Sequence, residues 1–182
     1  MSPWRITAFL ASAPGSRPGP TAAAIALGDG LARRGWGLVY GGAGVGLMAT
    51  LADAALAGGG EVIGVIPTDM VDREIAHRGL SRLDVVVSMA ARKQRMFELA
   101  DGFVTLPGGF GTLDELFEAV TAGLLGHHAK PIVLVDEGGY YRKLIEFIDG
   151  AVEAGLIRPA HRALLRVVPD VESALDALAP PA

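Results

Sequence analysis

Residues 103–120 read FVTLPGGFGTLDELFEAV, and this stretch decides the fold class. The short apolar run from Phe103 to Leu106 predicts a buried strand, and the spacing of apolar residues from Leu113 to Leu125 predicts a helix. Between them lies the loop Pro107 to Thr112, which contains three glycines. A strand, a glycine-rich loop and a helix in this order are typical of the βαβ units that build parallel sheets.

The same alternation of short apolar runs and helix-length segments extends along the rest of the chain. Strands that are apolar throughout are typical of a parallel sheet covered by helices on both faces. The sequence therefore predicts an α/β fold with one Rossmann-like, doubly wound parallel sheet, formed by a single domain over residues 1–182. The expected strands are Ile6 to Ala11, Gly37 to Tyr40, Glu61 to Ile66, Leu83 to Val87, Phe103 to Leu106, Ile132 to Val135 and Leu164 to Val168. The expected helices include Thr21 to Arg34, Gly46 to Ala57, Met89 to Ala100, Leu113 to Leu125 and Tyr140 to Ala154.

The composition narrows the class of protein further. The 182 residues suit one domain, and 51% apolar with 20% charged residues indicate a globular chain. The net charge of −4 argues against nucleic acid or an anionic membrane as a partner. The absence of cysteine excludes disulfides and thiolate metal sites, and the four histidines lack ligand spacing, so no metal site is predicted. We expect a cytoplasmic protein, because no stretch approaches a membrane span.

Three loops rich in glycine and hydroxyl groups follow expected strands: Ser12 to Ser16, Gly41 to Gly46, and Pro107 to Thr112. In doubly wound folds, ligands bind beyond the carboxyl ends of the strands. Glycines allow close approach of the backbone, and a following helix N-terminus favours an anion, so the third loop predicts a phosphate site. The alternative is a tight turn whose capping box pairs Thr112 with Glu115, which leaves the glycines unexplained.

The loop Gly41 to Gly46 contains a G-x-A-x-x-G pattern after a strand, which alone is a weak dinucleotide signal. The acidic residue expected at the end of the next strand is missing, since that strand ends in Ile66-Pro67-Thr68. A nucleoside monophosphate is therefore favoured over NAD. A simple tight turn remains the alternative for this loop.

In the helix expected from Met89 to Ala100, Arg92 and Lys93 fall on the apolar side near the helix start. Two inward-facing cations suggest a buried anion or carboxylate, and the alternative is a structural ion pair with Glu74 or Asp84. In the helix after Thr112, we expect a core face and an opposite stripe of small residues that marks a homodimer seam beside Glu115, the alternative being a plain exposed face. The core face is Leu113, Leu116, Phe117, Val120 and Leu124, and the stripe is Glu115, Ala119, Ala122 and Gly126.

These segments resemble a known family. Pro107 to Glu115 fits the PGGxGTxxE signature of the LOG ("Lonely Guy") family, and Met89 to Met96 resembles its second signature, an Arg-Lys pair at a Met-rich helix start. Tyr40 to Met48 and Glu61 to Pro67 also look like family segments, so the resemblance covers nearly the whole chain. This sequence departs from the family pattern at two places, which bear on base preference and phosphate contacts. Ala90-Ala91 stands where the family often has His-Glu, and Ala11-Ser12-Ala13 where it often has Gly-Ser-Ser.

The resemblance implies a cytokinin riboside 5′-monophosphate phosphoribohydrolase, which splits a nucleoside monophosphate into free base and ribose 5-phosphate. It implies no metal or cofactor. Family members were often labelled lysine decarboxylases, but nothing in this sequence suggests a pyridoxal phosphate site. Members of this length are usually dimers with active sites near the interface.

By the same resemblance, Arg92 and Glu115 match the catalytic pair. Glu115 would stabilise positive charge at the ribose C1′ and activate water, while Arg92 would hold the phosphate or ribose and orient Glu115. The substrate-binding positions are Glu74, Lys93, Gly109, Phe110, Gly111, Thr112 and Thr121, to which the loops add Ser12, Gly42, Gly44 and Gly108. The alternatives are a non-catalytic nucleotide-binding or sensing module and a dimeric scaffold without a ligand.

Overall fold

The computed structural model describes residues 3–16, 18–72 and 75–181. The strands are β1 (Arg5–Phe9), β2 (Gly37–Tyr40), β3 (Val62–Pro67), β4 (Arg82–Val86), β5 (Gly102–Thr105), β6 (Ile132–Val135) and β7 (Leu165–Val168). The helices are α1 (Gly19–Arg33), α2 (Gly46–Ala57), α3 (Thr68–Asp72), α4 (Met89–Leu99), α5 (Phe110–Leu124), α6 (Arg142–Glu153), α7 (Pro159–Arg162) and α8 (Val171–Ala177), with a 3₁₀ turn η1 at Glu137–Gly139.

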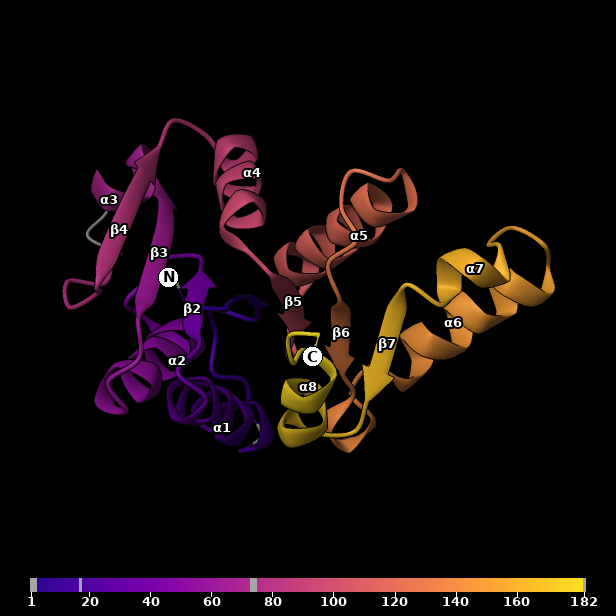
Figure 1. The fold of residues 1–182 in the computed structure, drawn as a ribbon, viewed down its shortest axis with the longest axis horizontal. Coiled ribbons are helices and arrows are strands. Elements are labelled where there is room, and N and C mark those ends of the chain that lie inside the picture. The colour runs from indigo at the N-terminus through magenta and orange to yellow at the C-terminus, as the bar shows by residue number, and fades with distance from the viewer. Residues whose placement is uncertain (1–2, 17, 73–74, 182) are drawn as a thin grey trace.

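The seven strands form one sheet in the order β4-β3-β2-β1-β5-β6-β7, and all neighbouring strands are parallel (Figure 1). This confirms the predicted doubly wound α/β fold. The order reverses between β1 and β5, which pair from Ile6 beside Gly102 to Phe9 beside Thr105. Connections leave these two strands in opposite directions, so a crevice is expected beyond their carboxyl ends.

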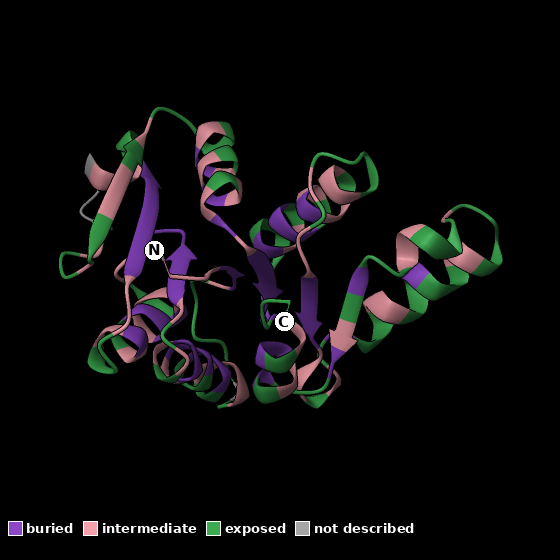
Figure 2. Ribbon diagram, in the orientation of Figure 1, coloured by how far each residue is buried: buried purple, intermediate pink, exposed green. Residues whose placement is uncertain are grey.

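Helices cover both faces of the sheet because side chains alternate along each strand. In β1, Ile6 and Ala8 pack in the core with α1, α2 and α8, whereas Phe9 packs in the core with α4, α5 and α6. Thr7 also faces the second side, where its hydroxyl donates to the carbonyl of Met96 at 3.1 Å. Figure 2 shows the central strands buried and the outer helix faces exposed.

The differences from the expected elements lie at the ends of strands and helices and in short helices. α3, α7 and α8 were not predicted, because they have only five, four and seven residues and are too short for a periodic pattern. α5 begins at Phe110, three residues before the expected start, with Gly109 as its N-cap and no side-chain cap bond. The capping-box interpretation of Thr112 and Glu115 is therefore wrong, since both residues lie inside the helix.

Candidate active site

A cavity of about 360 Å³ opens where the strand order reverses. Its walls come from the loop after β1, the loop after β5 and the first turns of α2, α4 and α5. Six of the residues that line it are Ser12, Met48, Met89, Arg92, Thr112 and Glu115. Of the predicted site residues, this cavity brings together Ser12, Arg92, Gly109, Phe110, Gly111, Thr112 and Glu115.

Arg92 lies at the wall of this cavity as a buried cation, only 6% exposed. Its Nε donates to the carbonyl of Val65 at 3.0 Å and its Nη2 donates to the carbonyl of Gly41 at 3.1 Å. A Cβ on Gly41 would collide with the guanidinium, so glycine is required there for Arg92 to reach this position. The inward orientation predicted for Arg92 is confirmed.

The partner of Arg92 is Glu115, whose Oε1 lies 3.8 Å from Nη1. Glu115 is 6% exposed, and no residue in the described part of the chain donates a hydrogen bond to its carboxylate. Burial raises the pKa of Glu115 to about 7, although the charge of Arg92 opposes this change. Burial likewise lowers the pKa of Arg92, which Glu115 partly offsets. A carboxyl group in this state exchanges a proton near neutral pH.

The alternative that paired Arg92 or Lys93 with Asp84 is wrong. Asp84 instead forms ion pairs with Arg82 at 2.6 Å and with Arg95 at 2.8 Å. Lys93 does not line the cavity, and its ammonium contacts Asp114 at 2.8 Å and Glu118 at 2.5 Å. Glu74, the other alternative partner and a predicted substrate contact, lies outside the described residues.

The start of α5 supplies the second feature of the cavity. No acceptor within the described ranges is bonded to the backbone N–H groups of Gly109, Phe110, Gly111 or Thr112. Added Cβ atoms on Gly109 and Gly111 would meet nothing within 4 Å, and neither residue has a positive φ. Neither packing nor backbone conformation therefore requires glycine at these two positions. Gly108 differs, because Thr112 fills the place of its Cβ.

The loop Gly41 to Gly46 does not line this cavity. Gly42 has a φ of +74° and packs against Val65, Ile66 and Leu83, and a Cβ on Gly44 would press on the backbone of His77. The N–H of Gly44 donates to the carbonyl of Ile75 at 2.7 Å, and that of His77 donates to the carbonyl of Gly42 at 2.9 Å. The structure thus places Gly42 and Gly44 in a tight turn, and the loop acts on the site through the Gly41 carbonyl.

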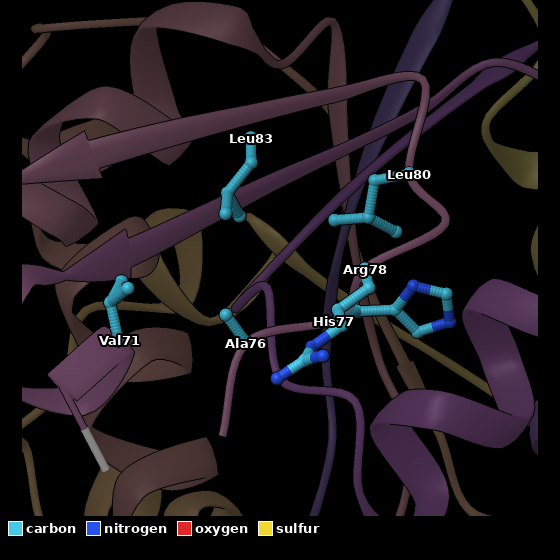
Figure 3. Close-up of a pocket in the computed structure, with 6 residues that line it drawn as sticks. All are labelled: Val71, Ala76, His77, Arg78, Leu80 and Leu83. Atoms are coloured by element: carbon cyan, nitrogen blue, oxygen red, sulfur yellow. The ribbon is translucent and has the colours of Figure 1, made fainter. Parts of the chain in front are cut away.

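A second cavity of about 360 Å³ lies beside this turn, between α3 and the β3–β4 edge (Figure 3). Val71, Ala76, Leu80 and Leu83 give it a mainly apolar lining, while the His77 ring points away from Val71 and pairs with Asp53 at 3.0 Å. It contains no carboxylate and no predicted site residue among those described, so the first cavity is the better candidate for chemistry.

The predicted faces of α5 are partly wrong. Glu115 and Ala119, assigned to an outer seam, are 6% and 0% exposed, whereas Phe117 and Leu124, assigned to the core, are 40% and 38% exposed. The small Ala119 thus lies on the buried face of α5 together with Leu116. Thr121 is also exposed and does not line the cavity of its own chain.

Sequence reasoning missed three residues that shape the site: Met48, Asp114 and Tyr140. Met48 and Asp114 line the cavity, and the hydroxyl of Tyr140 donates to the carbonyl of Gly108 at 2.8 Å. The positions of Met48 and Asp114, in the first turns of helices after glycine loops, were available as a signal. Nothing in the local sequence links Tyr140 to Gly108.

Comparison with known proteins identifies the family. Residues 48–178 match a family model described as "Possible lysine decarboxylase". The chain is 45% identical over 181 residues to the cytokinin riboside 5′-monophosphate phosphoribohydrolase of Rhodococcoides fascians, covering 99% of this chain and 91% of that protein. The enzyme of the same name from Mycobacterium tuberculosis is 42% identical, covering 97% and 94%. The chain belongs to the LOG family. Among solved structures, the Moco carrier protein of Chlamydomonas reinhardtii has a TM-score of 0.73 at 25% identity, covering 97% of this chain and 95% of that chain.

The decarboxylase description of this LOG family would require a lysine able to form a Schiff base with pyridoxal phosphate. Lys93 is the lysine nearest the cavity, but its hydrogen bonds to Asp114 and Glu118 raise the pKa of its ammonium. A protonated, ion-paired amine is a poor nucleophile. The residues of the described chain therefore do not fit this cofactor.

Proposed function

We propose that this LOG-family chain hydrolyses the N-glycosidic bond of adenosine 5′-monophosphate or an N6-substituted form of it. The products are the free base and ribose 5-phosphate. The observation that carries the proposal is the buried Arg92–Glu115 pair, with a carboxyl pKa of about 7, in one cavity with the open N-terminus of α5. The names of the relatives from Rhodococcoides fascians and Mycobacterium tuberculosis support the same reaction.

The start of α5 binds the phosphate in this proposal. Its unpaired N–H groups and the positive end of the helix dipole attract an anion, and Gly109 and Gly111 leave room for one. Thr112, only 4% exposed, adds a hydroxyl beside them. Binding energy from the phosphate, which does not react, then places the scissile bond against Glu115.

Glu115 performs the chemistry at C1′. The bond from C1′ to the base nitrogen breaks, the electron pair leaves with the base, and positive charge develops on the ribose ring. The Glu115 carboxylate stabilises this charge and accepts a proton from the water whose oxygen bonds to C1′. A proton is returned to the departing base. With a pKa of about 7, Glu115 is a stronger base than an ordinary carboxylate and is still substantially ionised at neutral pH.

Arg92 holds the Glu115 carboxylate in place and favours its ionised form. Its two bonds to the carbonyls of Val65 and Gly41 hold the guanidinium in one orientation, with Nη1 turned toward Glu115. The preorganised charge that faces C1′ is the carboxylate of Glu115, which Arg92 keeps in place during the reaction.

The proposal includes a homodimer. The LOG resemblance assigns Thr121 to the substrate, yet Thr121 is exposed and lies outside its own cavity, so it would reach the cavity of a second copy. Exposed apolar residues surround it, with Phe117 40%, Leu124 38% and Leu125 60% exposed. This surface replaces the small-residue stripe expected from the sequence. No helix in the described residues is long and apolar enough to cross a membrane, and a cytoplasmic location is part of the proposal.

The experiment incubates the purified protein with AMP and with isopentenyladenosine monophosphate and separates the products by chromatography. We expect adenine or the prenylated base to appear together with ribose 5-phosphate. A protein that binds AMP, but releases no base from either nucleotide, would instead be a nucleotide-binding or sensing module.

A further inference from the structure

Two adjacent tyrosines hold the loop before α5 from the side of η1. The hydroxyl of Tyr141 donates to the carbonyl of Leu106 at 2.9 Å, and the hydroxyl of Tyr140 donates to the carbonyl of Gly108 at 2.8 Å. The two rings lie edge to face, with centroids 4.8 Å apart and planes at 87°. The N–H of Tyr141 is anchored in turn on Asp136 Oδ1 at 2.6 Å. The tyrosine pair therefore has a fixed position relative to the loop.

The bond from Tyr140 sets the direction of one particular peptide group. No peptide bond among the described residues is cis, so the carbonyl of Gly108 and the N–H of Gly109 point in opposite directions across a planar unit. When the carbonyl points at Tyr140, the N–H of Gly109 points away from it. Gly109 lines the cavity, and its N–H has no acceptor among the described residues.

This peptide group needs an external restraint. It joins two glycines, which have more backbone freedom than any other residues, and no side chain of Gly109 can pack to hold it. Within the described ranges, the Gly108 carbonyl accepts its hydrogen bond from the hydroxyl of Tyr140. Without that donor, the peptide can rotate, and the N–H of Gly109 is then no longer preorganised.

We propose that Tyr140 is a positioning residue for nucleotide binding, whose hydroxyl orients the Gly108–Gly109 peptide so that the Gly109 N–H meets the 5′-phosphate. This inference rests on the proposed function, which places the phosphate at the start of α5. Tyr140 acts through the backbone and contacts neither the base nor C1′. Its hydroxyl therefore affects affinity for the phosphate more than the rate of bond cleavage.

The neighbouring residue provides a matched control. Tyr141 is 3% exposed and its ring lies in the core with α4, α5 and α6, whereas Tyr140 is 54% exposed. Tyr140→Phe removes one oxygen from a half-exposed ring and leaves the core intact. Tyr141→Phe removes the equivalent oxygen from the core ring, which donates to the carbonyl of Leu106 and not to that of Gly108, so it leaves the donor to the Gly108–Gly109 peptide in place. A purely structural role would make the Tyr141 variant the more damaging of the two for every property.

The test measures binding of AMP, adenosine and ribose 5-phosphate by calorimetry, together with KM and kcat for base release. For Tyr140→Phe, we expect Kd for AMP and for ribose 5-phosphate to rise about three- to tenfold, because one hydrogen bond to the phosphate is no longer preorganised. Affinity for adenosine and kcat should stay within about twofold of the wild type. Tyr141→Phe should lower the melting temperature more, with a smaller change in phosphate affinity.

Two results would overturn the inference in distinguishable ways. If wild-type protein prefers AMP to adenosine and Tyr140→Phe keeps that preference unchanged, the phosphate site stands and Tyr140 has no part in it. If wild-type protein binds AMP and adenosine equally, the phosphate site itself is wrong, and the role of Tyr140 falls with it.

Discussion

Glu115→Gln should make the protein more stable while removing its activity. In the folded chain the pKa of Glu115 is raised from 4.5 to about 7, so the ionised carboxylate is disfavoured there relative to the unfolded chain. Each pKa unit corresponds to about 1.36 kcal/mol, which makes this cost about 3 kcal/mol once the group is ionised in both states. Because the pKa is higher in the folded chain, the contribution of Glu115 to the free energy of unfolding is fully present below pH 4.5 and is lost as the pH rises through 7. A neutral glutamine does not carry this cost.

The expected result is a variant that is more stable than the wild type by up to about 3 kcal/mol at pH 8 and nearly equal to it at pH 4. Base release should fall at least about a hundredfold, because a neutral amide neither stabilises charge at C1′ nor accepts a proton. Denaturant unfolding at the two pH values and a chromatographic rate assay measure both effects. Glu98→Gln on the exposed face of α4 serves as the control and should change neither by much, because its ion pair with Arg95 lies at the surface.

Near wild-type base release by Glu115→Gln would remove this carboxylate from the mechanism. A stability difference that is the same at pH 4 and pH 8 would show that the raised pKa is not a property of the folded protein.

Three further results are expected. Between pH 6 and pH 8, kcat/KM should rise about tenfold as Glu115 ionises, and a flat profile would contradict its role as the ionised group. Gly109→Ala should weaken AMP binding at least about tenfold without unfolding the chain, whereas Gly150→Ala, whose added Cβ also meets open space, should leave binding unchanged; equal effects would refute a ligand at the α5 N-terminus. Phe117→Arg should convert a dimer to a monomer in light scattering and lower activity, because Thr121 is then withdrawn from the partner cavity. A wild-type protein that is already monomeric at micromolar concentration would contradict this prediction.

Much of the fold was predictable because its signal is local. Apolar runs such as Phe103 to Leu106 mark the strands, and the strand–glycine–helix order at Pro107 to Thr112 marks the crossover. Handedness rules then leave few alternatives to a doubly wound sheet. The inward position of Arg92 also followed from local spacing, because a charged residue on the apolar side of a helix is costly without a partner.

The remaining features depend on contacts between distant segments. Glu115 and Ala119 are buried and Phe117 is 40% exposed because of what packs against α5 from distant segments. Gly41 is a glycine because Arg92, 51 residues later, occupies the place of its Cβ. The bond from Tyr140 to Gly108 spans 32 residues. Helical periodicity and loop composition contain no information on such pairs.

The most direct test of the proposed reaction is a single incubation of AMP with the purified protein in water enriched in oxygen-18. Hydrolysis at C1′ predicts adenine and ribose 5-phosphate in equal amounts, with the heavy oxygen on C1′ of the sugar and none in the phosphate. Mass spectrometry measures the amounts of the two products and the position of the heavy oxygen in the same sample. Unchanged AMP, or adenosine with labelled phosphate, would contradict the account.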